Sequence, residues 1–267
     1  MCPHLEMPDR EYVVDFFGLE YRGNLRNWID WNVFFFGHYE IGILELMQRI
    51  VERRAGKSGV FVDVGSNVGL HSLFMSRCCA VVHAFEPYEP VRRRFEDMIR
   101  ANRITNIHVH PVGLASSEGR LPFRAPDASN LGQGSFSGAA AEAGGLELVI
   151  ARGDTILAAE RLERLDLVKI DVEGYERYAL EGLVDTLRRF EPVVVFEFTD
   201  ATRDTFEDAA SVLRLFPPGY RLLEIAEKRR DGASLGEFDF ERSGDVLACP
   251  AAESEAIRRE GREAGRG

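Results

Sequence analysis

Apolar residues in this chain fall into short runs, separated by segments with helical spacing. The run at 60–64 is apolar except for Asp63, which is typical of a strand buried on both faces of a parallel sheet. Further runs predict a strand that ends near Glu86 and strands at 107–112, 166–174, 193–198, 220–225 and 245–249.

Apolar positions three and four residues apart predict helices between these strands. They occur at 40–54, from Leu70 onward, at 90–102 and at 204–215. Strands that alternate with helices indicate an α/β fold with a doubly wound, mostly parallel sheet.

Length and apolar content suit one large α/β unit. The chain has 267 residues, of which 45% are hydrophobic. We expect an aromatic-rich N-terminal cap and helix at 1–57 and the main ligand-binding domain at 58–250. The segment 251–267 is charged and lacks apolar periodicity, so we expect a flexible tail there.

Two segments have an unusual composition. Residues 28–39 are heavily aromatic, and they either line a pocket or fill one end of the core. Residues 124–145 are rich in glycine and form a long loop between two strand-like runs. Loops of this length are usually functional or disordered, and we expect this one to close over a bound molecule.

The charge balance restricts the class of partner. A net charge of −11 and a pI near 5.2 argue against nucleic acid, because proteins that bind nucleic acids usually present a basic face. No apolar stretch approaches the roughly 18 residues that a membrane-spanning helix needs. No apolar segment typical of a secretion signal follows Met1. We therefore expect a cytoplasmic protein without a membrane partner.

The spacing of cysteines and histidines does not indicate a metal site. The four cysteines match neither a zinc motif nor a disulfide framework, which fits a reducing compartment. His108 and His110 lie two residues apart in a predicted strand, with no further ligand close by in the sequence. We interpret both as packed or surface groups.

A glycine-rich turn follows the strand at 60–64. Gly65-Ser-Asn-Val-Gly69 has the spacing G-x-x-x-G, which is neither the dinucleotide fingerprint nor a P-loop. The glycines permit a tight turn and a close approach of the backbone to a ligand. Because the helix that follows offers unpaired N–H groups, the turn can accept a polar ligand without being a triphosphate site.

Glu86 lies 23 residues after Asp63, at the end of the next apolar run. An acid at about this spacing contacts the ribose hydroxyls in Rossmann-like sites. Together with the glycine turn it predicts a site for an adenosine that carries no phosphate, and S-adenosylmethionine is the commonest cofactor of this kind. The alternative is an ordinary strand, turn and helix with a surface glutamate.

A second group of charged residues lies at 166–174. Lys169 and Asp171 share one face of an otherwise apolar strand, and Glu173 follows them. They form either a structural ion pair or a catalytic cluster, and we favour the cluster. Asp63, Glu86, Asp171 and Glu197 would all lie at the carboxyl ends of strands, where open parallel sheets bind ligands.

Three blocks of sequence resemble the successive motifs of the FkbM-type methyltransferase family. They are Asp63-Val-Gly-Ser-Asn-Val-Gly-Leu-His-Ser72, Ala84-Phe-Glu-Pro87 and Leu167-Val-Lys-Ile-Asp-Val-Glu-Gly174. Ser66 stands where the family usually has alanine. The resemblance runs from about Gly37 to Pro250 and implies a Rossmann-like class I methyltransferase, with a seven-stranded sheet that ends in an antiparallel strand. It also implies S-adenosylmethionine as cofactor and a small-molecule acceptor, most often a hydroxyl of a sugar or secondary metabolite.

The resemblance and the residue pattern together give a set of candidate cofactor residues. This set is Asp63, Gly65, Ser66, Asn67, Gly69, Ser72, Glu86, Pro87, Gly113 and Leu114. His38 and Glu40 belong to a short block that also resembles the family, and they are secondary candidates.

The candidate catalytic residues are Asp171, Glu173, Lys169 and Glu197. Asp171 would accept the proton of an acceptor hydroxyl, Lys169 would keep that carboxylate ionised, and Glu173 or Glu197 would orient the acceptor. Alternatively, the three acids hold a magnesium ion, which we do not favour because no histidine or asparagine completes an octahedral set. Methylation of nitrogen or of a protein, and an inert module that only binds the cofactor, remain as alternative functions.

Overall fold

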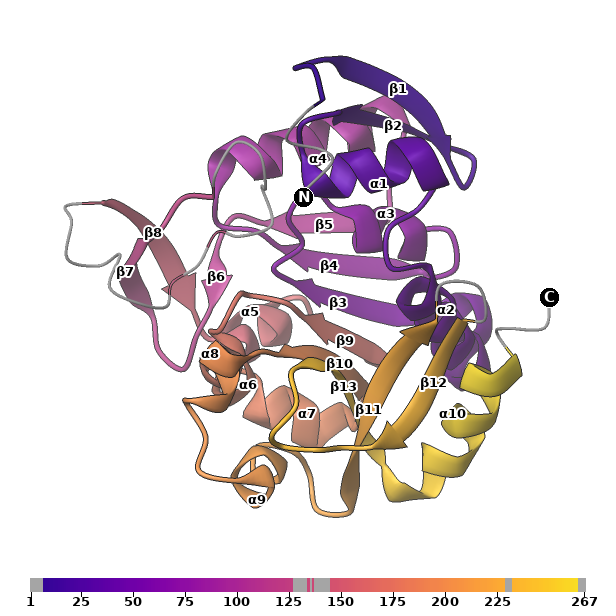
Figure 1. The fold of residues 1–267 in the computed structure, drawn as a ribbon. Helices are drawn as coiled ribbons and strands as arrows, with labels where there is room; N and C mark the ends of the chain where they lie inside the picture. Colours follow the sequence, from indigo (N-terminus) through magenta and orange to yellow (C-terminus); the bar gives the residue numbers. More distant parts are fainter. Residues whose placement is uncertain (1–6, 127–133, 135, 137–144, 229–231, 264–267) are drawn as a thin grey trace.

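A central eight-stranded sheet with helices on both faces forms the body of the computed structural model (Figure 1), which describes residues 7–126, 134, 136, 145–228 and 232–263. The strand order is β12-β11-β13-β10-β9-β3-β4-β5. Five strands are parallel: β3 (Val60–Val64), β4 (Val81–Phe85), β5 (Ile107–His110), β9 (Leu167–Ile170) and β10 (Val193–Phe198). The antiparallel strands are β11 (Tyr220–Lys228), β12 (Gly232–Glu237) and β13 (Gly244–Pro250). The predicted doubly wound α/β fold is confirmed.

The helices form two layers. One face of the sheet is covered by α2 (Ile41–Ala55), α3 (Leu70–Met75), α4 (Glu89–Ala101) and α10 (Ala251–Glu263). The other is covered by α5 (Gly153–Ala159), α6 (Glu176–Glu181), α7 (Val184–Phe190) and α9 (Ala209–Leu213), and α8 (Asp200–Arg203) follows β10. None of the helices in the described part of the chain combines the length and apolar character needed to span a bilayer.

The two layers explain why the central strands are apolar at nearly every position. In β3, Phe61 belongs to the core beneath α2, α3 and α4, whereas Val62 and Val64 belong to the core beneath α5, α6 and α7. Successive side chains of a strand point to opposite faces, so a strand between two helical layers needs apolar residues on both.

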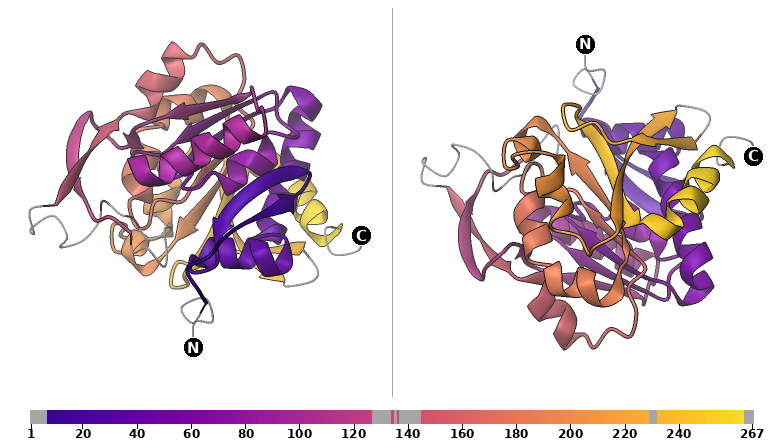
Figure 2. Two further views of the ribbon diagram at one scale, coloured as in Figure 1. Left: turned by 90° about the horizontal axis from the view of Figure 1, so that it is seen from above. Right: turned by 90° about the horizontal axis from the view of Figure 1, so that it is seen from below.

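A second antiparallel unit lies at the N-terminus. β1 (Glu11–Phe16) and β2 (Leu19–Asn24) are joined by Phe17 and Gly18, whose φ angles are 51° and 85°. The hairpin packs with α1 (Trp28–Phe36) over α4 (Figure 2). Two consecutive positive φ values match the two-residue turns that suit the twist of a hairpin.

Buried Asp30 ties this unit to the body. Its Oδ1 accepts a hydrogen bond from the Tyr21 hydroxyl at 2.8 Å, and its Oδ2 accepts from Arg94 Nη2 in α4 at 2.9 Å. Asp30 is fully buried, whereas the Arg94 side chain is 29% exposed. Removing Arg94 would therefore leave the buried charge of Asp30 without its counter-ion.

A small three-stranded sheet stands away from the body. It contains β6 (Gly113–Leu114), β7 (Gly119–Phe123) and β8 (Leu146–Ala151) in the order β6-β8-β7 (Figure 1). The expected lid at 124–145 lies between β7 and β8, and most of it falls outside the described residues.

Three expectations from the sequence were wrong. In the described part of the chain the main sheet has eight strands and not seven, because the short strand β12 pairs along β11. The helix expected at 204–215 is much shorter, because Asp208 caps the start of α9, which runs only over Ala209–Leu213. Residues 251–263 form helix α10 and are not a flexible tail.

Tertiary contacts explain why α10 is ordered up to its described end. Ile257 of α10 is fully buried in the core. Glu253 of the same helix forms ion pairs with Arg53 and Arg54 of α2. A single buried apolar residue gives little periodicity in the sequence, so the helix was not predicted.

Because Ile257 anchors α10, we expect Ile257→Ala to lower the free energy of unfolding by about 2–5 kcal/mol, the usual cost of emptying a buried isoleucine site. Urea denaturation followed by circular dichroism measures this. The control is Glu255→Ala, an exposed position in the same helix. Equal stability of the two variants would mean that the segment does not pack as described.

Candidate functional site

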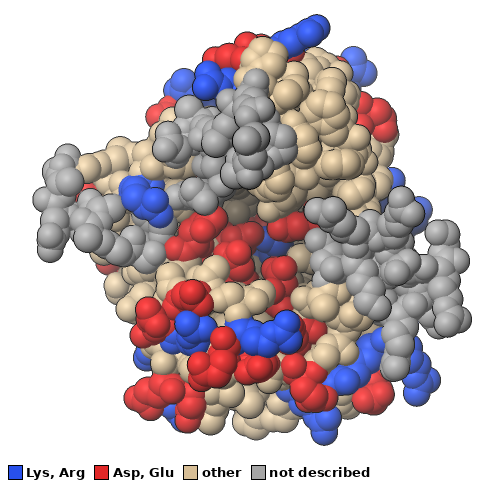
Figure 3. Space-filling view, in the orientation of Figure 1, with Lys and Arg blue, Asp and Glu red and all other residues tan. Residues whose placement is uncertain are grey.

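A cavity of about 330 Å³ lies where β3, β4, β9 and β10 end. Its polar lining includes five acids, Glu40, Glu86, Asp171, Glu173 and Glu197. Lys169 is the one lysine or arginine among the described lining residues. Acidic side chains gather around a hollow on this face of the molecule (Figure 3). The site is therefore strongly acidic and unsuited to a polyphosphate.

The glycine turn shapes one wall of the cavity. Gly65 and Gly69 have φ angles of 80° and 81°, and Asn67 between them has 52°. A Cβ on Gly65 would lie 1.9 Å from the backbone oxygen of Asp171, and one on Gly69 would lie 1.9 Å from the ring of Phe95. Both positions thus require glycine for close packing as well as for the turn.

Glu86 links this turn to the start of α4. Its Oε2 accepts a hydrogen bond from the Asn67 backbone N–H at 3.0 Å, and its Oε1 accepts from the Tyr88 N–H at 2.8 Å. Burial raises the pKa of Glu86 to about 7, although these hydrogen bonds act in the opposite direction. Each oxygen retains a lone pair for a ligand hydroxyl.

The predicted cofactor residues separate into two groups. Those that line the cavity are Gly65, Ser66, Asn67, Glu86, Pro87, Gly113 and Leu114. Asp63, Gly69 and Ser72 are not among the described lining residues. Ser72 Oγ donates to Asp63 Oδ2 at 2.6 Å, and Asp63 is only 1% exposed, so this pair supports the wall from behind.

The predicted catalytic residues all line the cavity. Lys169 Nζ lies 2.7 Å from Asp171 Oδ2 and is almost fully buried. Carboxyl oxygens of Asp171, Glu173 and Glu197 lie within 4.8 Å of one another. Three carboxylates at this separation repel one another unless protons or a cation intervene.

Burial and this crowding change the protonation of the acids. Burial, together with the charge of Asp171, raises the pKa of Glu173 to about 7 and that of Glu197 to about 9. Oε2 of Glu197 is buried and has no hydrogen-bond partner among the described residues. Glu197 is therefore largely protonated at neutral pH and able to donate a hydrogen bond into the cavity.

Glu176 supports the cluster, and the sequence analysis missed it. This fully buried residue accepts hydrogen bonds from the N–H groups of Val172 and Gly174 at 3.0 and 3.2 Å, and from the Thr202 hydroxyl at 2.5 Å. It thereby holds the turn in which Glu173 has a φ of 54°. An acid in the first turn of α6 was the only signal in the sequence.

The N-terminal segment also contributes to the lining of the cavity. Trp28, Ile29, Tyr39 and Glu40 line the cavity, whereas His38 is not among the described lining residues. The Phe34, Phe35 and Phe36 side chains are 40–58% exposed, so they do not fill the core. The sequence left open whether this aromatic segment lines a pocket or fills the core. Trp28 and Tyr39 line the pocket.

Glu40 is paired with a residue of the glycine-turn helix. Its Oε2 lies 3.1 Å from His71 Nε2. Burial acts to raise the pKa of Glu40, but His71 and the charge of Lys169 outweigh it and hold the pKa at about 2. Glu40 is thus an anion, and its negative charge from the N-terminal segment offsets the positive charge of Lys169.

Comparisons with known proteins find similarity to methyltransferases. Residues 63–222 match the family model described as the Methyltransferase FkbM domain. The hexuronic acid methyltransferase AglP of Haloferax volcanii is 31% identical over 148 residues, which cover 55% of this chain and 59% of AglP. Methyltransferase 1 of Beauveria bassiana is 26% identical over 172 residues, which cover 57% of this chain and 69% of that protein.

Other matches cover smaller parts of their partners. The AMB antimetabolite synthetase AmbE of Pseudomonas aeruginosa is 31% identical over 182 residues, covering 53% of this chain and 8% of AmbE. A crystal structure of Methyltransferase FkbM from Methylobacillus flagellatus aligns with a TM-score of 0.49 and 17% identity, over 72% of this chain and 44% of that one. The chain thus spans less than two thirds of AglP and of AmbE.

The family model covers more than half of the chain, from Asp63 in β3 to Leu222 in β11, and it includes the glycine turn, Glu86 and the acidic cluster. The protein belongs to the FkbM family of methyltransferases.

Proposed function

We propose that this methyltransferase uses S-adenosylmethionine to methylate a hydroxyl of a sugar or a related small metabolite. The observation that carries the proposal is the cluster of Asp171, Glu173 and Glu197 beside the Lys169 ammonium, in the same cavity as the glycine turn. A hydroxyl needs a base to become a good nucleophile, and this cluster provides candidates.

The cavity suits this cofactor in charge and shape. S-adenosylmethionine supplies, when bound, an electrophilic methyl group on a positively charged sulfonium. The lining acids favour a cation, and the tight turn at Gly65 and Asn67 forms part of the wall. Glu86, with a lone pair left on each oxygen, would hold the ribose hydroxyls, and Gly113 with Leu114 would flank the adenine.

The chain's own residues would then prepare the acceptor. Asp171 is fixed by Lys169 and would take the hydroxyl proton. Protonated Glu197 would donate a hydrogen bond to a neighbouring acceptor oxygen and so orient it. The aromatic faces of Trp28 and Tyr39 would exclude water from the cavity.

The sugar assignment is supported by the relative AglP, whose name specifies a hexuronic acid. The lining acids disfavour an anionic acceptor when no cation is present. Neutral sugars and polyols are therefore the first acceptors to test, with hexuronic acids tested both with and without magnesium.

A magnesium ion bound by Asp171, Glu173 and Glu197 is a second way to relieve their repulsion, since all three offer oxygen ligands within 4.8 Å of one another. If the ion organises the acceptor, EDTA should abolish turnover and magnesium should restore it. If EDTA leaves turnover unchanged, magnesium does not have this role. Proton sharing within the cluster would then be what relieves the repulsion between the acids.

We expect Glu86→Ala to weaken the binding of S-adenosylmethionine and S-adenosylhomocysteine about 10- to 100-fold, because charge-assisted hydrogen bonds to the ribose are lost. Isothermal titration calorimetry measures both ligands. Glu89→Ala, an exposed position at the start of α4, is the matched control. Tight binding of NAD instead, or an unchanged affinity in Glu86→Ala, would contradict the cofactor assignment.

We expect Asp171→Asn to lower kcat by about 10²–10⁴ while cofactor affinity is kept, the range for a lost general base. Glu173→Gln is the comparison, because Glu173 has a pKa of about 7. If Glu173 were the base, activity of the wild type would rise between about pH 6 and about pH 8 as it loses its proton, and Glu173→Gln would lose that rise. A near-normal kcat in Asp171→Asn would show that Asp171 is not the general base.

A further inference from the structure

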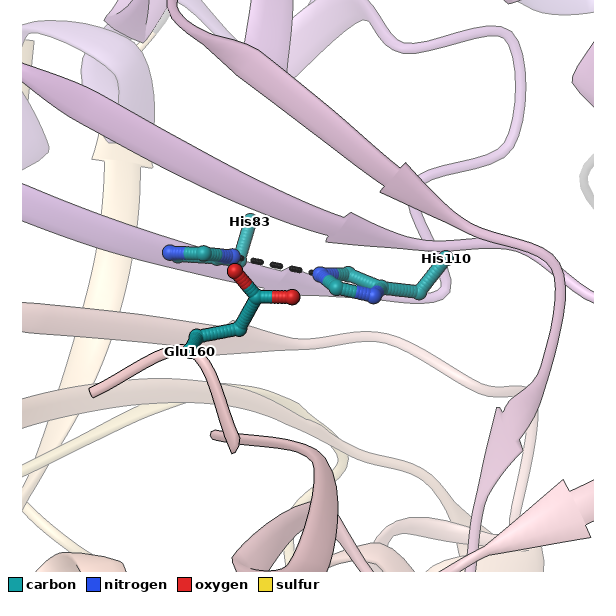
Figure 4. Close-up of side chains that lie close together, drawn as sticks. All are labelled: His83, His110 and Glu160. Atoms are coloured by element: carbon teal, nitrogen blue, oxygen red, sulfur yellow. Dashed lines mark hydrogen bonds between the residues drawn. The ribbon is translucent and has the colours of Figure 1, made fainter. Parts of the chain in front are cut away.

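Three side chains outside the cavity converge on the face of the sheet that α5 covers. His83 lies in β4, His110 is the last residue of β5, and Glu160 is the C-cap residue of α5 (Figure 4). None of them is among the described residues that line the cavity. The Glu160 carboxylate points toward the two imidazoles, so three separate elements meet at one point.

The separation of the two imidazole nitrogens fits a shared metal ion. His83 Nδ1 lies 3.1 Å from His110 Nε2. Two nitrogens bound at about 2.0–2.1 Å to one zinc ion lie roughly 2.9–3.4 Å apart, for angles between octahedral and tetrahedral. The ligand atoms of all three residues lie within 4.8 Å of one another. Glu160 is exposed, and its flexible side chain can close the remaining distance by rotating.

The surroundings leave the imidazoles available as ligands. Burial lowers the pKa of His83 to about 4 and also lowers that of His110, which the negative charge of Glu160 opposes. The other titratable group against His83 is His108, whose ring centroid lies 5.2 Å away. A metal ion needs a lone pair on both facing nitrogens, so the proton of their hydrogen bond would move to the far nitrogen of the ring that carries it.

We propose that His83, His110 and Glu160 form a binding site for a zinc-type divalent transition metal. Two imidazoles and a carboxylate suit such an ion better than magnesium or calcium, which prefer oxygen ligands. Water would complete the coordination on the exposed side of Glu160. The ion would join β4, β5 and α5, and thereby fix the strand ends that lead to Glu86 and Gly113 in the cavity.

This site was not visible in the sequence. His108 and His110 were interpreted as packed or surface groups because no ligand lies nearby in the chain. The structure instead brings His83 and Glu160, which are 27 and 50 residues from His110, to the same point. Only the pairing of β4 with β5 and the position of α5 create the cluster.

The test uses the full chain after removal of any histidine tag. We expect the wild type to bind one equivalent of Zn²⁺ in competition with a chromophoric chelator, and Co²⁺ to give a visible absorption band from nitrogen and oxygen ligands. His110→Ala and Glu160→Gln should each weaken Zn²⁺ binding by about tenfold or more. Zn²⁺ should raise the Tm of the wild type and not that of either variant.

Two controls make the result specific. His108→Ala removes a histidine that also stacks on His83 but lies outside the cluster, and it should bind Zn²⁺ like the wild type. Glu197→Gln alters the acidic cluster in the cavity and should retain the site as well. Glu160 is exposed, so its variant reports on the site even if His110→Ala folds poorly.

The proposal is overturned if the wild type shows no saturable binding of Zn²⁺ or Co²⁺, which would leave the two histidines as a simple hydrogen-bonded pair. It is also overturned if Glu197→Gln abolishes binding while His110→Ala and Glu160→Gln do not, because the metal would then occupy the cavity.

Discussion

The site depends on the pairing of the buried Lys169 ammonium with acidic side chains. The ammonium contacts Asp171 directly, and the charges of Glu40 and Asp63 also stabilise its protonated form, although burial opposes this. Asp171 directly follows β9, Glu40 directly precedes α2, and Asp63 lies in β3. A buried charge without partners costs several kcal/mol, so the cluster is stable only while all these elements meet at the end of the sheet.

This constraint links the cap, the sheet and the chemistry. Asp30 fixes the N-terminal hairpin on α4, and the same segment delivers Trp28, Tyr39 and Glu40 to the cavity. Glu176 fixes the turn that carries Glu173 from the opposite helical layer. Buried acids on each side of the sheet therefore position the acids that face the cavity, while the apolar strands between them supply the rigidity.

Much of this arrangement could be predicted from the sequence. Uninterrupted apolar runs indicated the parallel strands, and acids at the ends of those runs had to meet at one edge of the sheet, as Glu86, Asp171 and Glu197 do. Asp63 also lies at such a strand end, but its side chain is bonded to Ser72 of α3 and is not among the described lining residues, because strand period alone does not show which side chain reaches the surface of a cavity. α10, β12, Glu176 and the His83 cluster depend on contacts between distant segments, and local periodicity carries no signal for them.

On the proposed function, the acidic cluster serves methyl transfer to oxygen. The most direct measurement is incubation of the protein with S-adenosylmethionine carrying a ¹³C-labelled methyl group and a panel of neutral sugars, followed by NMR of the products. We expect a labelled methyl group with the chemical shift of a methyl ether, together with one equivalent of S-adenosylhomocysteine. Label attached to nitrogen, or to the side chains of a protein acceptor in place of any sugar, would contradict it.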